Sequence, residues 1–117
     1  MEKEIDIREI SRKFTWPRDE RSRKLFGFII RKALKTMDVK KIILYGSRAR
    51  KDSNKFSDYD IAIDTDTDFS TWARFSLEIE DNVETLLPVD VVQLNSVNPE
   101  LKNRIERDGK VLYDKKG

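Results

Sequence analysis

The chain has 117 residues, of which 39% are charged and 38% hydrophobic, a composition typical of a soluble globular domain with a small core. It has no cysteine and no histidine, which excludes thiolate zinc sites, thiol nucleophiles, histidine-assisted serine catalysis and a disulfide framework. The net charge is only +2, but residues 1–57 contain 17 basic and 8 acidic residues, whereas residues 58–117 contain 7 and 14. Unless folding mixes the two halves in space, this asymmetry can steer anions or match a partner of complementary charge.

The first apolar spacing along the chain lies in residues 7–14 and predicts a short helix, which Pro17 interrupts. A longer helix is predicted from Asp19 onward, with cationic residues on its opposite side and the following residues on or near one stripe: Leu25, Phe28, Ile29, Lys32, Ala33 and Met37. Residues 41–45 form a short β-branched run that Gly46 closes, which is typical of a buried strand.

Residues 59–64 alternate in polarity and predict a second strand. A second long helix is predicted over residues 69–87 before Pro88, because large apolar side chains recur at helical spacing: Trp72, Phe75, Ile79, Val83 and Leu86. The remaining predicted elements are a strand over residues 89–94, a helix from Pro99 through Arg107 that Gly109 stops, and an edge strand over residues 111–113.

This order of elements predicts an α/β (α+β) fold, in which helices flank a mixed sheet. We expect one domain, with residues 1–17 as an N-terminal extension and residues 18–113 as the core. Since the sequence contains neither a signal peptide nor a membrane span, we expect a cytoplasmic protein.

A basic turn follows the first predicted strand. Gly46 permits a sharp turn and Ser47 is a good N-cap, so the chain can begin a helical turn whose N–H groups face outward and bind anions. The hydroxyl of Ser47 and the cations of Arg48, Arg50 and Lys51 add to this tendency. A Gly-Ser pair alone is more often an ordinary turn with solvated cations, so the turn indicates a phosphate site only together with other features.

Three aspartates provide those features. Asp58 and Asp60 lie two residues apart, so in a strand their side chains share a face, with Cα atoms roughly 6–7 Å apart. Their repulsion favours one or two divalent cations, although the polar face of an edge strand is the ordinary alternative. Asp90 lies between Val89 and Val91, where an unpaired charge would be costly, so we expect it to join the other two if the strands are neighbours in register.

Together the turn and the aspartates predict a nucleotidyl-transfer site. Gly46, Ser47 and the nearby cations would hold the outer phosphates of a nucleoside triphosphate, and Asp58 and Asp60 would hold the Mg²⁺ ions that bridge them. Asp90 would share a metal and orient or deprotonate an acceptor hydroxyl, which attacks the α-phosphate as pyrophosphate leaves. The base must be a carboxylate, because the chain has no histidine.

The same residues resemble the signature of the DNA polymerase β-type nucleotidyltransferases, and in particular of the minimal nucleotidyltransferases. The likeness covers about residues 20–113 and consists of Gly-Ser, ten residues, Asp-x-Asp and a later aspartate in an apolar strand, with the wording GSRAR and SDYDIAI. It implies that Gly46 and Ser47 are the nucleotide-binding pair and that the metal-binding, catalytic carboxylates are Asp58, Asp60 and Asp90. Lys51 stands where members commonly carry a glycine.

The resemblance also implies a partner. Members of this family are typically paired with a helical HEPN-domain protein, often as the antitoxin of a two-component system, and some transfer AMP from ATP to a tyrosine of that toxin. We expect a single catalytic domain without a second one to select the acceptor, which agrees with a protein acceptor. Two alternatives remain open: a module that neutralises its partner by binding alone, and nucleotidyl transfer to RNA or a small molecule.

Other phosphate and metal sites fit the sequence less well. The DTDTD run at residues 64–68 has Phe69 and Phe75 where a calcium-binding loop needs glycine and glutamate. No Gly-Lys-Ser/Thr follows a strand, which excludes a P-loop NTPase. A nucleic-acid module is not favoured, because the chain has no stacking motif and its total charge is nearly balanced.

Overall fold

The computed structural model describes residues 20–50, 58–81 and 88–116, so the predicted helix over residues 7–14 lies outside the described residues. The elements in chain order are α2 (Glu20–Thr36), β1 (Val39–Tyr45), α3 (Ser47–Arg50), β2 (Tyr59–Thr65), α4 (Phe69–Glu80), β3 (Val89–Gln93), η1 (Leu94–Ser96), α5 (Pro99–Asp108) and β4 (Lys110–Asp114). None of the helices in these ranges combines the length and the apolar character needed to cross a membrane.

The strands form one four-stranded sheet in the order β3-β2-β1-β4. Strand β1 pairs antiparallel with both β2 and β4, whereas β2 pairs parallel with β3. A parallel pair needs a crossover connection, and α4 lies in the segment that links β2 to β3. The predicted mixed sheet with flanking helices is therefore confirmed, and β4 lies at the sheet edge as predicted.

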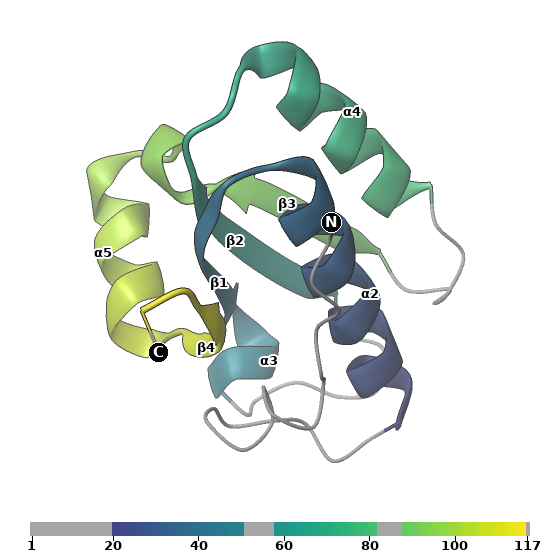
Figure 1. Ribbon diagram of the computed structural model, residues 1–117. Coiled ribbons are helices and arrows are strands. Elements are labelled where there is room, and N and C mark those ends of the chain that lie inside the picture. The colour runs from purple at the N-terminus through teal and green to yellow at the C-terminus, as the bar shows by residue number, and fades with distance from the viewer. Residues whose placement is uncertain (1–19, 51–57, 82–87, 117) are drawn as a thin grey trace.

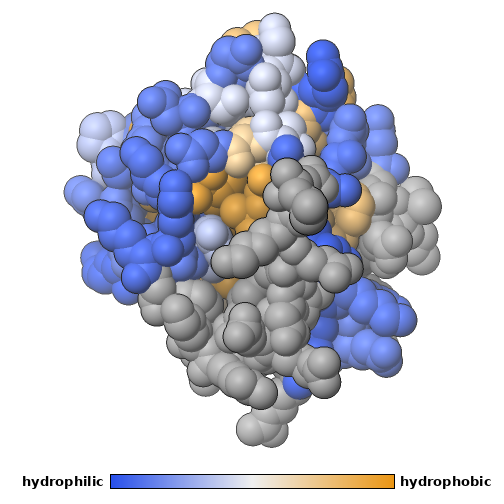
Figure 2. Space-filling model, viewed as in Figure 1, coloured by the Kyte–Doolittle hydropathy of each residue, from blue (hydrophilic) through white to orange (hydrophobic). Residues whose placement is uncertain are grey.

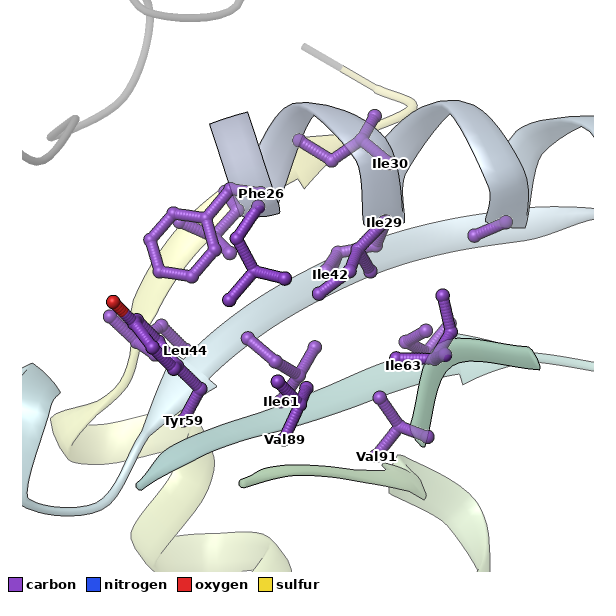
Figure 3. Packing of buried hydrophobic residues seen from close by; sticks show 14 of the residues in the cluster. Phe26, Ile29, Ile30, Ile42, Leu44, Tyr59, Ile61, Ile63, Val89 and Val91 are labelled. Carbon is purple, nitrogen blue, oxygen red and sulfur yellow. The ribbon is translucent and has the colours of Figure 1, made fainter. Parts of the chain in front are cut away.

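Helices cover both faces of the sheet (Figure 1). Side chains of α2 and α4 pack with Ile61 and Ile63 of β2 in the larger apolar cluster, whereas Ile105 of α5 packs with Ala62 and Ile43 in a smaller cluster. Alternation along β2 thus sends successive side chains to opposite layers. Figure 3 shows α2 residues meeting those of three strands in the larger cluster, and Figure 2 shows the hydrophilic surface of α5 beside apolar surface at the centre of the view.

Helix α2 provides most of the cover of the larger cluster. Its predicted stripe is confirmed for Leu25, Ile29 and Ala33, each at most 2% exposed. The buried stripe is wider than the sequence pattern predicted, because Phe26 and Ile30 are also buried. The helix is amphipathic, because this broad apolar side lies opposite its arginines and lysines.

Helix α4 is shorter than predicted. The carboxylate of Asp68 accepts a hydrogen bond of 2.8 Å from the backbone N–H of Thr71 and caps the N-terminus. The helix ends at Glu80, and the backbone N–H of Asp81 donates to the carbonyl of Leu77 as a C-cap. The rest of the predicted helix, residues 82–87, lies outside the described residues.

We predict that Ile61→Ala lowers the free energy of unfolding by about 2–5 kcal/mol, because Ile61 is fully buried between α2 and the sheet and its removal leaves a cavity. Urea denaturation measures the effect. The control Lys40→Ala changes an exposed side chain of β1 and should stay within about 0.5 kcal/mol. Equal stability of the Ile61→Ala variant and wild type would contradict the assigned core.

Candidate active site

Three strands place Tyr45, Asp60 and Asp90 in one row across the sheet. Tyr45 is the antiparallel partner of Asp60, and Asp60 is the parallel partner of Asp90. Paired residues on neighbouring strands lie about 5 Å apart and point to the same face. The row therefore brings the two carboxylates side by side. They lie on the face of the sheet to which Ala62 of the smaller cluster also points.

The carboxylate of Asp90 is open to solvent, whereas Asp60 is half-buried. Val89 and Val91 are 9% and 6% exposed, because they point toward the larger cluster on the opposite face. The expectation that Asp90 sits in apolar surroundings was wrong, since the apolar neighbours lie on the other side of the strand. The site is thus accessible at Asp90, and no burial cost forces this residue to find a partner.

Asp58 is also exposed, and it directly precedes β2. Among the described residues, no three carboxylate, histidine or cysteine side chains lie close enough to form a metal-binding group. The predicted convergence of Asp58, Asp60 and Asp90 is therefore met only for Asp60 and Asp90. Two adjacent carboxylates nevertheless suit Mg²⁺, a hard cation that usually takes one or two protein carboxylates and fills its remaining positions with water and substrate phosphates.

The turn after β1 lies directly against Asp60. Gly46 has a φ of +77°, in the left-handed region that favours glycine, and a Cβ at this position would lie 2.5 Å from Oδ2 of Asp60. The backbone N–H of Ala49 donates to the carbonyl of Gly46 at 3.1 Å, so the chain enters the short helix α3 at once. The structure thus places Ser47, the first residue of α3, beside the carboxylate row.

The two predicted phosphate-binding arginines belong to α3, but only the side chain of Arg48 lies within the described part of the structure. The guanidinium carbon of Arg48 lies 3.9 Å from the centroid of the Tyr59 ring, a cation–π contact. Tyr59 and Asp60 are consecutive in β2, so this contact is on the face opposite the carboxylate row. Lys51 lies outside the described residues.

Tyr45 is a site residue that the sequence pattern did not single out. Its burial raises the pKa of its hydroxyl to about 12, and the negative charges of Asp60 and Asp90 act in the same direction. The hydroxyl stays protonated near neutral pH and remains a hydrogen-bond donor beside two carboxylates. Its position immediately before Gly46 could have indicated that it lies near the turn. Its place in the row could not be predicted, because it depends on the register of β1 and β2.

Comparison with known proteins gives two matches along the sequence. A family model described as polymerase beta nucleotidyltransferase matches residues 29–117. The protein adenylyltransferase MntA of Aphanizomenon flos-aquae (strain 2012/KM1/D3) is 30% identical over 94 residues, which cover 68% of this chain and 59% of the relative. The chain therefore spans about three fifths of the length of this curated relative.

The solved structures that share the fold include the following two. A toxin–antitoxin structure with AMP-PNP matches with a TM-score of 0.63 and 23% identity, covering 76% of this chain and 73% of the other. A structure of the tri-AMPylated Shewanella oneidensis HEPN toxin in complex with its MNT antitoxin matches with a TM-score of 0.61 and 21% identity, covering 80% and 72%. At these identities the likeness is evidence for the fold.

We predict that Gly46→Ala destabilises the protein by about 1–3 kcal/mol, because the residue must keep a positive φ and its new methyl group meets the Asp60 carboxylate. Urea denaturation measures the cost, with Ser47→Ala as a control that adds no atom to the same turn. In an Asp60→Ala background the cost should shrink, since the contact is removed. An unchanged cost in that background would rule out the contact as its source.

A second prediction concerns the pH dependence of stability. Tyrosine in an unfolded chain has a pKa of about 10, below the value of about 12 for Tyr45 in the folded protein. Unfolding therefore releases a proton between these values, and the free energy of unfolding falls as the pH rises from 10 to 12. The free energy of unfolding of Tyr45→Phe, measured with urea, should fall less steeply over this pH range. The difference between the two slopes gives the contribution of Tyr45, because the lysines titrate equally in both proteins. Identical slopes would contradict the assignment.

Proposed function

Because this chain belongs to the polymerase β nucleotidyltransferase family, we propose that it transfers AMP, or another nucleoside monophosphate, from a nucleoside triphosphate to a hydroxyl group of a protein. The observation that carries the proposal is the pairing of Asp60 with Asp90 directly beside the turn at Gly46. AMP and a protein acceptor are supported by the relative MntA, a protein adenylyltransferase.

The nucleotide would bind at the turn between β1 and α3. The backbone of Gly46, the hydroxyl of Ser47 and the charge of Arg50 suit phosphate oxygens, while Arg48 contributes to the turn through its contact with Tyr59. Asp60 and Asp90, which are paired across the strands, would hold Mg²⁺ together, and Asp58, directly before β2, would be a further ligand of a two-ion site. When bound, Mg²⁺ would neutralise charge on the triphosphate and on the departing pyrophosphate. Because Gly46 lies against Asp60, a triphosphate bound at this turn would be next to the carboxylate row.

The reaction forms one bond and breaks one. The acceptor hydroxyl oxygen attacks the α-phosphorus, the bond from this phosphorus to the oxygen bridging to the β-phosphate breaks, and pyrophosphate leaves. The carboxylate of Asp90 takes the proton of the hydroxyl as general base. Its exposure to solvent suits an acceptor that a second protein presents from outside, and the Tyr45 hydroxyl, a donor beside both carboxylates, would help to hold their orientation.

The acceptor would be a tyrosine of a HEPN-type toxin, with this chain acting as the antitoxin. Support comes from the two structures of similar fold, which are toxin–antitoxin complexes, one of them with a tri-AMPylated HEPN toxin. Modification of the toxin by its partner would explain why the site needs an accessible base. The two proteins would form a hetero-oligomer.

A second candidate is an antitoxin that neutralises its partner by binding alone. Phe69 and Leu77 of α4 are 84% and 58% exposed, and residues eight positions apart lie on the same side of a helix. This apolar side of α4 is suited to contact with another protein. Transfer and simple binding differ in whether the aspartates are needed.

We predict that Asp58→Asn/Asp60→Asn lowers transfer of labelled AMP from ATP to the co-expressed HEPN partner by more than about 100-fold, since it removes the charges that would hold Mg²⁺. The matched control Asp64→Asn/Asp66→Asn makes the same charge change at the same spacing, at the other end of β2. The control should transfer normally, and excess EDTA should abolish transfer by wild type. Folding of both variants is checked by circular dichroism.

The outcomes separate the candidates. Label on the toxin from wild type and control, but not from Asp58→Asn/Asp60→Asn, supports protein adenylylation. Label on RNA or on a small molecule would keep the chemistry and overturn the proposed acceptor. Full neutralisation of the toxin by the Asp58→Asn/Asp60→Asn variant would favour the antitoxin that acts by binding alone.

A further inference from the structure

Tyr59, the residue between the two aspartates Asp58 and Asp60, connects three elements of the fold. It is 1% exposed, and its hydroxyl lies 2.8 Å from the hydroxyl of Ser22 in α2. Its ring meets the ring of Phe26, also in α2, edge to face at 5.7 Å between centroids. In Figure 3, Tyr59 and Phe26 lie together at one end of the apolar cluster. Tyr59 is therefore a fixed point relative to α2.

Two consecutive residues of α3 contact Tyr59 and the apolar cluster to which it belongs. The guanidinium of Arg48 lies over the Tyr59 ring at 3.9 Å, and Ala49 is 3% exposed in the same apolar cluster. Both contacts are on the face of β2 opposite Asp60. Figure 1 shows α3 directly after β1 at the end of the sheet, and these contacts join α3 to Tyr59 of β2 and to the larger apolar cluster.

A side chain that binds a phosphate of the nucleotide would need its positive charge on the side of the carboxylate row, where the triphosphate and its metal ions would lie. The Arg48 cation is instead on the ring of Tyr59, across the strand from Asp60. Planar guanidinium groups stack well on aromatic rings, whereas a lysine ammonium does so less well. The contact between Arg48 and Tyr59 therefore connects α3 to β2.

We propose that Arg48 is a positioning residue: stacked on Tyr59, it fixes the turn at Gly46–Ser47 and α3 against β2, and it acts on the nucleotide through this turn rather than by touching a phosphate. This inference rests on the proposed nucleotide site at the turn and assigns Arg48 and Tyr59 a shared role in it. Loss of either stacking partner should then weaken the turn in the same way, because each change removes the same contact.

The first test measures the turn without any nucleotide. Native-state hydrogen exchange, read by NMR, follows the N–H of Ala49, which donates to the carbonyl of Gly46 at 3.1 Å. Arg48→Gln and Tyr59→Leu should each speed its exchange by about tenfold, equivalent to about 1.4 kcal/mol. Tyr59→Phe keeps the ring and removes only the contact with Ser22, so it should exchange like wild type. Unchanged exchange in both Arg48→Gln and Tyr59→Leu would overturn the proposal.

The second test measures the affinity for ATP with Mg²⁺ by isothermal titration calorimetry on the same full-length variants. Arg48→Gln and Tyr59→Leu should each weaken binding by about tenfold, and the double variant by no more than either single variant, because coupled residues are not additive. Tyr59→Phe should bind like wild type, although it is less stable because the hydrogen bond between Tyr59 and Ser22 is lost. Weaker binding by Arg48→Gln with normal binding by Tyr59→Leu, or additive losses, would show that Arg48 contacts phosphate directly and would overturn the proposal.

The two tests also separate this inference from the proposed function. If wild type binds neither ATP nor another nucleoside triphosphate, the nucleotide site fails, and with it the claim that Arg48 acts on a nucleotide. Faster exchange at Ala49 in Arg48→Gln and Tyr59→Leu would still support the stacking role in that case. Normal exchange together with normal nucleotide binding in these variants would overturn the positioning role alone.

Discussion

Strand β2 is paired on both sides, antiparallel with β1 and parallel with β3, and this double pairing determines where each part of the site lies. The antiparallel pair sets Tyr45 beside Asp60 and brings the following turn against the Asp60 carboxylate. The parallel pair sets Asp90 on the other side of Asp60. A shift of one residue in either register would send one of these side chains to the opposite face of the sheet.

The two faces of β2 carry residues with different roles at the site. Asp60 faces the side where transfer would take place, while Tyr59 on the other face holds α2 and α3 in position. Of these two consecutive residues, one belongs to the carboxylate row and the other to the larger apolar cluster. A single strand can carry both because its side chains alternate.

Much of this fold follows from local sequence patterns. The strands near residues 41–45 and 59–64 are marked by β-branched runs and alternation, and α2 by its stripe, so their positions were predicted to within a few residues. Long-range contacts were not predictable in this way. The contact between Arg48 and the Tyr59 ring could not be predicted, because the two residues are eleven positions apart and meet only in the folded chain. Asp90 looked buried because its valine neighbours are, although they face the opposite side. The roles of the aspartates and of the turn remain predictions.

The crossover between β2 and β3 has a consequence for folding. The contacts of β1 with β2 join segments that are close in sequence, whereas β3 reaches β2 only after the chain has passed through α4. Closing the longer loop costs more chain entropy, so we expect β3 to dock after the β1–β2 pair has formed. A chain that has folded only as far as β2 then holds Gly46 against Asp60 but lacks Asp90. Nascent protein emerging from the ribosome would pass through this incomplete state before its last carboxylate arrives.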